Sequence, residues 1–190
     1  MKKIGMALML IGLTVVTFNG YEWLKGFRSI APFNGFARAF DDRQGDQQYE
    51  KGEAVARLTI PRLERTFTVF WGTDEDTLEK GVGMYVSQWT APPGHGAHTV
   101  LAGHRDTVFT GLGELTEGDI LYVAYNGRDY EYEIDKIWVT DADDRSVIVE
   151  KKEPTLTLTT CYPFDYIGDA PKRYIVQAKL VRKGDLLKDP

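Results

Sequence analysis

The stretch of sequence that decides the fold is Thr155–Val176, which reads TLTLTTCYPFDYIGDAPKRYIV. Its opening residues alternate threonine with leucine, and a β-branched run with a period of two indicates a strand. A segment containing proline, aspartate and glycine follows, as in a loop, and a second strand is predicted from Arg173 to Val181. The only cysteine, Cys161, therefore lies where one strand ends, and Arg173 where the next begins. Functional side chains are often held at such strand ends.

A second polar cluster ends another predicted strand, upstream in the chain. His98–Gly103 has strand composition and leads directly into His104. A single cysteine with a separate histidine is the combination that suggests a cysteine nucleophile. The alternative is that Cys161 is a small buried side chain, the usual state of a free cysteine. Thiol labelling of the folded protein would separate the two, because a buried thiol reacts only after denaturation.

Three motifs together resemble the signature of the sortases, the membrane-anchored cysteine transpeptidases of Gram-positive cell surfaces. They are TLTTC at Thr157–Cys161, AGHRD at Ala102–Asp106, and Arg173 within APKRYIV. The order of histidine, cysteine and arginine, with spacings of 57 and 12 residues, fits that family. The resemblance covers residues 54–183, and the wording GHRDTVF is most similar to class D sortases.

This resemblance implies a catalytic role for each of three residues. Cys161 would be the nucleophile, His104 would protonate the leaving amine, and Arg173 would stabilise the oxyanion or hold the substrate backbone. The implied reaction cleaves a C-terminal sorting signal of the type Leu-Pro-x-Thr-Gly (or Ala) through a thioacyl enzyme. The surface protein that carried the signal would then be joined to an amine of a peptidoglycan precursor. Two other functions stay open: another cell-wall cysteine peptidase, and a non-catalytic membrane-tethered β-domain.

Further residues are expected around this set. Asp106 is a candidate to orient His104, and Thr160 is a candidate supporting residue. By resemblance, the walls of a peptide groove are expected from Leu158 and from the loops Asp141–Pro154 and Tyr162–Lys172. The second loop includes Tyr162 and Phe164, and its remaining aromatic, apolar and acidic residues are Asp165, Tyr166, Ile167 and Asp169.

No cofactor or metal is expected. The acidic run Asp141, Asp143 and Asp144 has the oxygen ligands that calcium prefers, but a solvated turn is the simpler interpretation. His95 and His98 are weaker candidates for catalysis than His104. His95 lies in a Pro/Gly loop, and His98 at the head of a strand is expected to line the outside of the sheet.

The rest of the chain reads as short strands separated by turns. Strands are predicted at Val55–Ile60, Thr66–Trp71, Asp119–Tyr125 and Asp129–Val139, a short helix at Asp74–Gly81, and a helical piece or turn at Gly111–Gly118. The last two strands of this set flank Asn126-Gly127, a strong hairpin signal. Many strands with little helix indicate an all-β barrel or sandwich, and the resemblance selects a closed β-barrel of about eight strands.

The N-terminal region differs in composition. Lys2 and Lys3 precede the apolar run Ile4–Phe18, so residues 1–27 are expected to be a single-pass signal anchor with the remainder outside the cytoplasm. Residues 28–53 are expected to be a stalk, mixed and partly helical at first and then polar, and residues 54–190 the catalytic domain. The net charge of −5 argues against a nucleic-acid partner.

Overall fold

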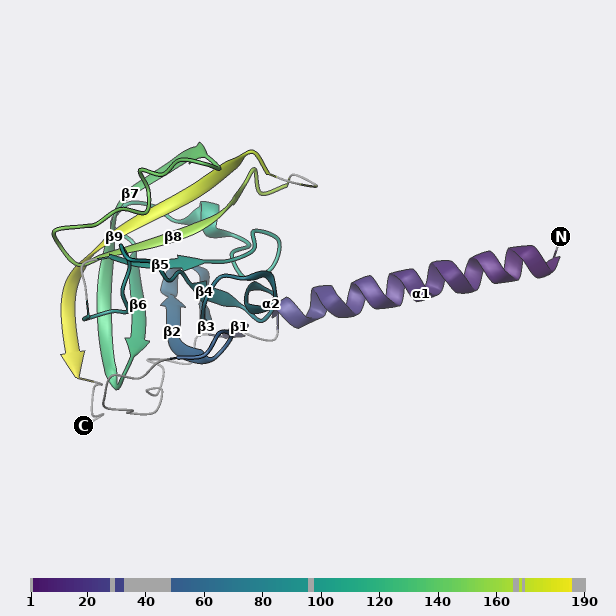
Figure 1. Ribbon diagram of the computed structural model, residues 1–190, viewed down its shortest axis with the longest axis horizontal. Coiled ribbons are helices and arrows are strands. Elements are labelled where there is room, and N and C mark those ends of the chain that lie inside the picture. Colours follow the sequence, from purple (N-terminus) through teal and green to yellow (C-terminus); the bar gives the residue numbers. More distant parts are fainter. Residues whose placement is uncertain are drawn as a thin grey trace.

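The computed structural model of the chain describes residues 2–27, 30–32, 49–95, 98–165, 168 and 170–185. These residues form nine strands, shown in Figure 1. The strands are β1 (Ile30–Pro32), β2 (Ala54–Ile60), β3 (Arg65–Trp71), β4 (Val82–Met84), β5 (His98–Ala102), β6 (Ile120–Tyr125), β7 (Arg128–Asp141), β8 (Thr155–Tyr162) and β9 (Lys172–Asp185). The helices are α1 (Lys2–Phe27) and α2 (Glu75–Leu78), with single 3₁₀ turns η1 (Pro61–Leu63) and η2 (Leu112–Glu114).

The strands close into a barrel. Their order is β1-β3-β2-β6-β7-β9-β8-β5-β4, and an additional pairing of β3 with β4 joins the two sides of the sheet. Strands β2 to β9 thus form an eight-stranded closed barrel, and β1 pairs with the free part of β3. The predicted all-β barrel of about eight strands is confirmed.

The interior is filled by alternate side chains of the strands. Leu156 and Leu158 of β8, with Val176 and Ala178 of β9, are fully buried members of one apolar core. Because side chains alternate between the two faces of a strand, Thr157, Thr159 and Cys161 point to the outside of the barrel. The alternation of threonine and leucine in this stretch is therefore the alternation between the outside and the core.

Local signals in the sequence explain several elements. Asp74 caps α2 by accepting hydrogen bonds from the Thr77 backbone N–H (3.3 Å) and hydroxyl (3.0 Å), as expected of an N-cap aspartate. Asn126 and Gly127 adopt positive φ angles of 48° and 70°, which close the β6–β7 hairpin as predicted.

Two short strands, β1 and β4, were not predicted from the sequence. Within β4, Gly83 interrupts the apolar pattern, yet a Cβ there would come within 2.4 Å of the Gly72 carbonyl oxygen. The glycine is thus required where the chain passes close to its own backbone. Strand β1 lies in the segment expected to be mixed and partly helical, and its register pairs Ile30 with Phe67.

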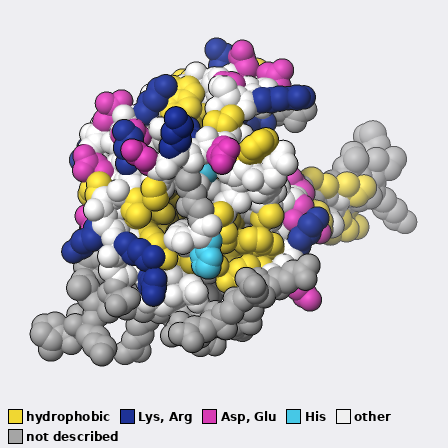
Figure 2. All heavy atoms as spheres, turned by 60° about the vertical axis from the view of Figure 1, so that its left-hand side comes forward, with side chains coloured by type: hydrophobic (Ala, Val, Ile, Leu, Met, Phe, Trp, Pro, Cys, Tyr) yellow, Lys and Arg dark blue, Asp and Glu magenta, His cyan; other side chains and the backbone are white. Residues whose placement is uncertain are grey.

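The outer faces of the long strands β7 and β9 carry charges of both signs. Arg182 reaches Glu131 across the strands at 2.7 Å, and Lys179 reaches Asp135 at 3.0 Å. Figure 2 shows positive and negative side chains interspersed over one face of the molecule. Cross-strand pairs of this kind add modest stability and keep an exposed strand surface polar.

At the N-terminus, residues 2–27 form the continuous helix α1. Large apolar side chains among those described in this helix, such as Met9 and Val16, are exposed. No helix among the described residues is long and apolar enough to cross a membrane, so the structure does not support the predicted transmembrane span. Most of the predicted stalk, residues 33–48, lies outside the described residues, and the three domain boundaries stay a prediction.

Candidate active site

Cys161 and Arg173 are brought together by the pairing of β8 with β9. They lie directly opposite each other in this antiparallel pair. Residues so placed point to the same face of the sheet, with Cβ atoms typically about 5 Å apart. The Cys161 thiol is partly exposed, so it is not the buried structural cysteine of the alternative interpretation. The thiol and the guanidinium therefore share one accessible patch on the outside of the barrel.

His104 is held at the same end of the neighbouring strand. Strands β5 and β8 are parallel, with Ala102 beside Thr159, and the pairing continues through a hydrogen bond from the Gly103 N–H to the Thr159 carbonyl oxygen at 3.2 Å. The buried Thr160 hydroxyl donates to the Gly103 carbonyl oxygen at 2.7 Å. His104, the next residue, thus lies beside the end of β8 that carries Cys161. Thr160 supports this arrangement from inside the barrel.

Close packing explains why the residue before His104 is a glycine. A Cβ at Gly103 would come within 2.7 Å of Val108 and 2.9 Å of Phe109. Both of those side chains are fully buried and have no space to move into. Gly103 therefore lets the end of β5 pass close to the core, which determines where the His104 backbone lies.

A carboxylate on α2 lies near His104. The Oε1 atom of Glu75, in the first turn of α2, is 3.8 Å from His104 Nε2. The side chain of His104 is 34% exposed and that of Glu75 is 76% exposed. Asp106, predicted for this role, is itself exposed, and the carboxylate that the structure places near the imidazole belongs to Glu75. No motif in the sequence points to Glu75, which lies 29 residues before His104.

Of the predicted groove residues, Leu158 must be corrected. It is fully buried in the core, because it alternates with the outward-facing Thr157 and Thr159 and so points into the barrel. Tyr162 and Phe164 are partly buried and form an aromatic cluster with Tyr174, with ring centroids 5.1 to 6.0 Å apart. Phe164 also packs against the core. These two aromatic side chains close the end of the barrel beneath the site.

The second half of the loop between β8 and β9 is held by hydrogen bonds from two arginines. Arg173 Nη1 donates to the carbonyl oxygens of Lys172 (2.9 Å) and Ala170 (3.2 Å). From the other side, Arg105 Nη2 donates to the Gly168 carbonyl oxygen at 2.8 Å. Asp165 is exposed, whereas the predicted loop residues Tyr166, Ile167 and Asp169 lie outside the described residues.

A third loop covers the outer face beside Cys161. His98, which is almost fully buried, contacts the Val149 carbonyl oxygen through Nδ1 (2.7 Å) and the Thr157 hydroxyl through Nε2 (2.9 Å). Burial lowers the pKa of His98 below its ordinary value, although the contact with Val149 opposes this effect. This histidine thereby anchors the loop of residues 142–154 to the strand that carries Cys161.

In the acidic run Asp141, Asp143 and Asp144, the Asp144 carboxylate stabilises a turn. Asp144 accepts hydrogen bonds from the Thr140 hydroxyl and from the Ser146 N–H and hydroxyl, at 2.8 and 2.7 Å for the latter two. These bonds lower the pKa of Asp144. Among the described residues, no group of three or more histidine, cysteine, aspartate or glutamate side chains is arranged to hold a metal ion.

A family model supports an identification. The sortase domain model matches residues 58–181. Sortase D of Bacillus subtilis is 45% identical over 133 residues, which are 70% of this chain and 66% of that protein. The chain spans just under two thirds of the length of the curated relatives that it matches.

Solved structures agree with the family model. The catalytic domain of SrtD from B. anthracis is 58% identical, with a TM-score of 0.64 over 74% of this chain and 96% of that domain. Clostridium perfringens sortase C, solved with the C-terminal cell wall sorting motif, is 25% identical, with a TM-score of 0.65 over 75% of this chain and 78% of that one. The resemblance to class D sortases is therefore confirmed, and the chain belongs to the sortase family of cysteine transpeptidases.

Proposed function

We propose that this protein cleaves a C-terminal sorting signal of the type Leu-Pro-x-Thr-Gly (or Ala) after the threonine and joins the new carboxyl end to an amine of a peptidoglycan precursor. The observation that carries the proposal is the cross-strand pair of Cys161 and Arg173, with His104 held beside the same strand end. This arrangement supports the proposal, because a thiol, an imidazole and a guanidinium on one partly exposed patch can serve as nucleophile, proton donor and permanent cation.

The first half-reaction forms a thioester. The Cys161 thiolate attacks the threonine carbonyl carbon, and the carbonyl oxygen becomes an oxyanion that the Arg173 guanidinium stabilises. The C–N bond then breaks, and protonated His104 gives its proton to the leaving amine. The threonine carbonyl is left bonded to the Cys161 sulfur, and the C-terminal remainder of the substrate departs.

The second half-reaction returns the enzyme to its starting state. Neutral His104 takes a proton from the incoming amine as the amine attacks the thioester carbon. The C–S bond breaks, the Cys161 thiolate is released, and a new amide bond joins the two partners. Water competes with the amine for the same thioester, so transfer requires that the surrounding loops position the amine or exclude water.

The choice of substrate is supported by a relative. Clostridium perfringens sortase C, which shares the fold, has been solved with its C-terminal cell wall sorting motif. In the present chain, Cys161, Arg173 and the end of β5 lie on the outer face of strands β5, β8 and β9, and the loop of residues 142–154 borders this face. We therefore include in the proposal that this chain binds its substrate as an extended peptide.

Mass spectrometry of the full-length protein tests the first half-reaction. After incubation with a panel of sorting peptides, a peptide that fits should add to Cys161 the mass of its acyl part, and Cys161→Ala should gain none. If no peptide of the panel adds mass to Cys161 while a small thiol reagent labels it, the proposed substrate class is wrong.

The ratio of products tests the second half-reaction. Raising the concentration of a peptidoglycan stem-peptide amine should shift the product from hydrolysed to amide-linked peptide, measured by chromatography. A ratio that stays constant across several wall-type amines would identify the protein as a peptidase.

The cellular location is a separate part of the proposal. A sortase meets its partners outside the cytoplasm, and Lys2 and Lys3 before an apolar run favour a cytoplasmic N-terminus. Protease added to intact protoplasts should then degrade residues 54–190. Protection of that region until the membrane is lysed would refute this location.

A further inference from the structure

The strand pairing holds two of the three residues of the proposed reaction more directly than the third. Cys161 and Arg173 are partners in one antiparallel pair of strands, so the register itself sets their separation. His104 follows Gly103, whose N–H makes the hydrogen bond that joins the end of β5 to β8. The place of the imidazole therefore depends on the segment that comes next, residues 104–111, which we call the His104 turn.

One side of the His104 turn is anchored in the core. The Phe109 N–H donates to the His104 carbonyl oxygen at 3.0 Å, and the side chains of Val108 and Phe109 are fully buried. The Thr110 hydroxyl donates to the Thr107 carbonyl oxygen at 2.9 Å. These contacts hold the backbone of the turn against the barrel, but they do not connect it to the loop between β8 and β9.

Arg105 connects the His104 turn to that loop. Its Nη2 atom donates to the Gly168 carbonyl oxygen at 2.8 Å, across 63 residues of sequence. Gly168 has a φ of 104°, which residues other than glycine rarely adopt. The hydrogen bond thus joins the residue next to His104 to the segment of chain that runs from Cys161 to Arg173.

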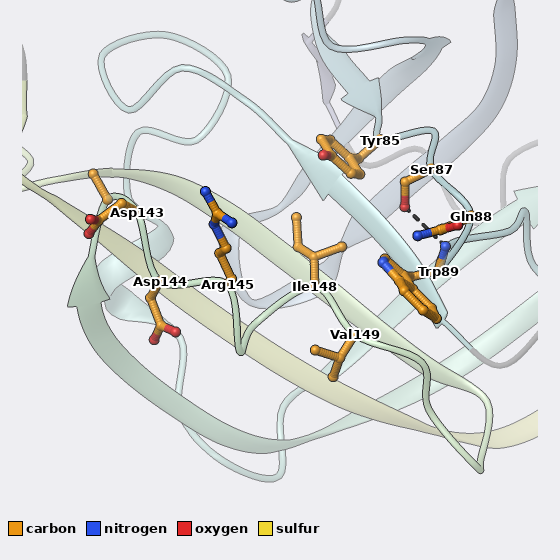
Figure 3. A pocket seen from close by; sticks show the side chains of 10 residues that line it. Tyr85, Ser87, Gln88, Trp89, Asp143, Asp144, Arg145, Ile148 and Val149 are labelled. Carbon is orange, nitrogen blue, oxygen red and sulfur yellow. Dashed lines mark hydrogen bonds between the residues drawn. The ribbon is translucent and has the colours of Figure 1, made fainter.

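A second contact holds the same loop against the same part of the chain. A Cβ at Gly113 in η2 would come within 2.8 Å of the Phe164 ring, so the ring rests directly on the backbone there. The other loop that borders the site, residues 142–154, faces Trp89 across a cavity of about 690 Å³ (Figure 3). It is thus the loop between β8 and β9 that contacts the segment carrying His104.

We propose that Arg105 is a positioning residue for the transfer reaction, and that its hydrogen bond to Gly168 determines where the His104 imidazole lies. This inference rests on the proposed function. His104 has to reach first the leaving amine and then the incoming amine within hydrogen-bond distance. Both amines meet the carbon that is bonded to the Cys161 sulfur, and an error of about 1 Å in such an arrangement can cost about a hundredfold in rate. Arg105 itself contacts no reacting atom in this role.

The competing explanation is that Arg105 acts through its charge. A guanidinium in this region would favour the thiolate and the neutral imidazole. The two explanations differ in their dependence on salt, because Arg105 is partly exposed and salt screens exposed charges, whereas a geometry set by a hydrogen bond persists. They also differ at Gly168, which carries no charge.

The first test is steady-state kinetics of the full-length protein with the best sorting peptide. Arg105→Ala should lower kcat about tenfold with little change in KM, at low and at high salt alike. Arg105→Lys should recover most of the loss, because one ammonium hydrogen satisfies one carbonyl oxygen. Arg65→Ala is the matched control and should keep a normal kcat, since Arg65 Nη1 donates to the Thr110 carbonyl oxygen of the same turn, also at 2.8 Å.

Three results of these measurements would overturn the inference. The first is an equal loss of kcat in Arg105→Ala and Arg65→Ala, which would show that any anchor of the turn matters to the same extent. The second is a loss that disappears at high salt, which would assign the effect to charge. The third is a failure of Arg105→Lys to recover activity.

Substitution at the acceptor tests the same hydrogen bond without changing any charge. Gly168→Ala strains a positive φ in open space, because nothing lies within 4 Å of the Cβ position. It should reproduce the kcat loss of Arg105→Ala, and the double variant should be no slower than the slower single variant. Gly118→Ala in the turn before β6, with a φ of 91° and equally open space, is the matched control. Losses that multiply in the double variant would assign separate roles to the two residues and overturn the inference.

Nuclear magnetic resonance of His104 separates this inference from the proposed function. In protein that carries isotope-labelled histidine, the imidazole signal of His104 is assigned by its loss in His104→Gln, and the variants are compared at one pH. Arg105→Ala and Gly168→Ala should shift this signal whether or not any peptide is processed. The controls Arg65→Ala and Gly118→Ala should leave it in place. An unshifted signal in Gly168→Ala would overturn the inference even if the protein transfers peptides, whereas a shifted signal without transfer to any amine would refute the proposed function alone.

Discussion

Cys161 and Arg173 lie directly opposite each other on β8 and β9, so the barrel itself sets the separation of the thiol from the guanidinium. Arg173 also donates to the carbonyl oxygens of Ala170 and Lys172, which restricts the orientation of its planar head. One backbone register thus controls the positions of Cys161, of Arg173 and of the end of the loop between β8 and β9. A substitution that preserves the charge of Arg173 but changes its shape separates these roles.

We predict that Arg173→Lys lowers kcat/KM at least tenfold and that Arg173→Ala lowers it about a hundredfold or more. A single ammonium cannot reproduce the fork of donors, and loss of one oxyanion donor typically costs about 10²–10³ in rate. The matched control is Arg182→Lys on the same strand, where Arg182 pairs with Glu131 instead. Steady-state kinetics with the best peptide measure the effect. An unchanged circular dichroism spectrum shows that each variant is folded. Near-normal turnover of Arg173→Ala would remove this residue from the mechanism.

The Gly103 backbone offers a test of how precisely His104 must be placed. Gly103→Ala pushes a Cβ against Val108 and Phe109, and overpacking of this kind costs about 1–3 kcal/mol. We expect a lower melting temperature and, well below it, a fall in kcat of at least tenfold. Gly184→Ala on β9 is the control, because no atom lies within 4 Å of its Cβ position. A destabilised Gly103→Ala with normal kcat would show that the end of β5 tolerates displacement.

Much of this site was predictable because its signals are local. The alternating run before Cys161, the loop composition after it and the apolar strand before His104 are each contained in a few residues of sequence. The same alternation should have excluded Leu158 from the groove, since every second residue of the run points to the core. Leu158 is close to Cys161 along the strand, but its side chain points to the opposite face of the sheet.

The parts of the site that could not be predicted from sequence depend on closure of the barrel. No local sequence pattern indicates which strands pair to close it. Glu75 lies near His104 because β3 pairs with β4, and this pairing places α2, which connects the two strands, beside the site. Likewise, Tyr85 and Trp89 face the loop of residues 142–154 only after β5 has paired with β8. Strand β4 itself was missed, since it is three residues long and contains a glycine.

Substitution can rank Glu75, which lies near His104, against Asp106, which was predicted from sequence to orient it. Glu75→Gln should reduce kcat/KM about two- to threefold at low salt, with the difference fading at high salt, because an exposed pair contributes little and is screened. Asp106→Asn should have no comparable effect, since its side chain is exposed and it is Glu75 that lies 3.8 Å from the imidazole. The opposite ranking, measured at matched ionic strength, would return Asp106 to the role predicted from sequence.

The domain is predicted to begin before Ala54. Tyr49 packs on Trp71 with ring centroids 5.0 Å apart, and its hydroxyl lies 3.0 Å from that of Tyr125. A protein truncated to start at Ala54 should therefore melt several degrees lower than one that starts at Tyr49, since an aromatic pair contributes about 0.5–1.5 kcal/mol beyond its burial. Differential scanning calorimetry compares the two, with Tyr49→Ala in the longer protein as the control for chain length. Equal melting temperatures would place the boundary at Ala54.

His98 should make the stability of the protein depend on pH near neutrality. Its pKa is lowered from the ordinary value of 6.5 chiefly by burial, with a smaller contribution from the nearby Lys151. The unfolded chain therefore binds a proton at a pH where folded His98 still resists it, and stability rises with pH in that range. The contribution of His98 is fully present above about pH 6.5 and is lost as the pH falls through the lower value of the folded state.

The measurement is the melting temperature at pH 7.5 and pH 5.5 for the wild type and for His98→Gln, which does not titrate. We expect the wild type to lose more stability on acidification than the variant does. Every other ionisable group is common to the two proteins, so the effects of those groups cancel in the difference. The amides of the loop of residues 142–154 should report the same event by lower protection at pH 5.5, measured relative to the intrinsic exchange rate at each pH, because protonation disturbs a buried imidazole that contacts both Val149 and Thr157. If His98→Gln loses as much stability as the wild type, this histidine does not control the acid sensitivity of the fold.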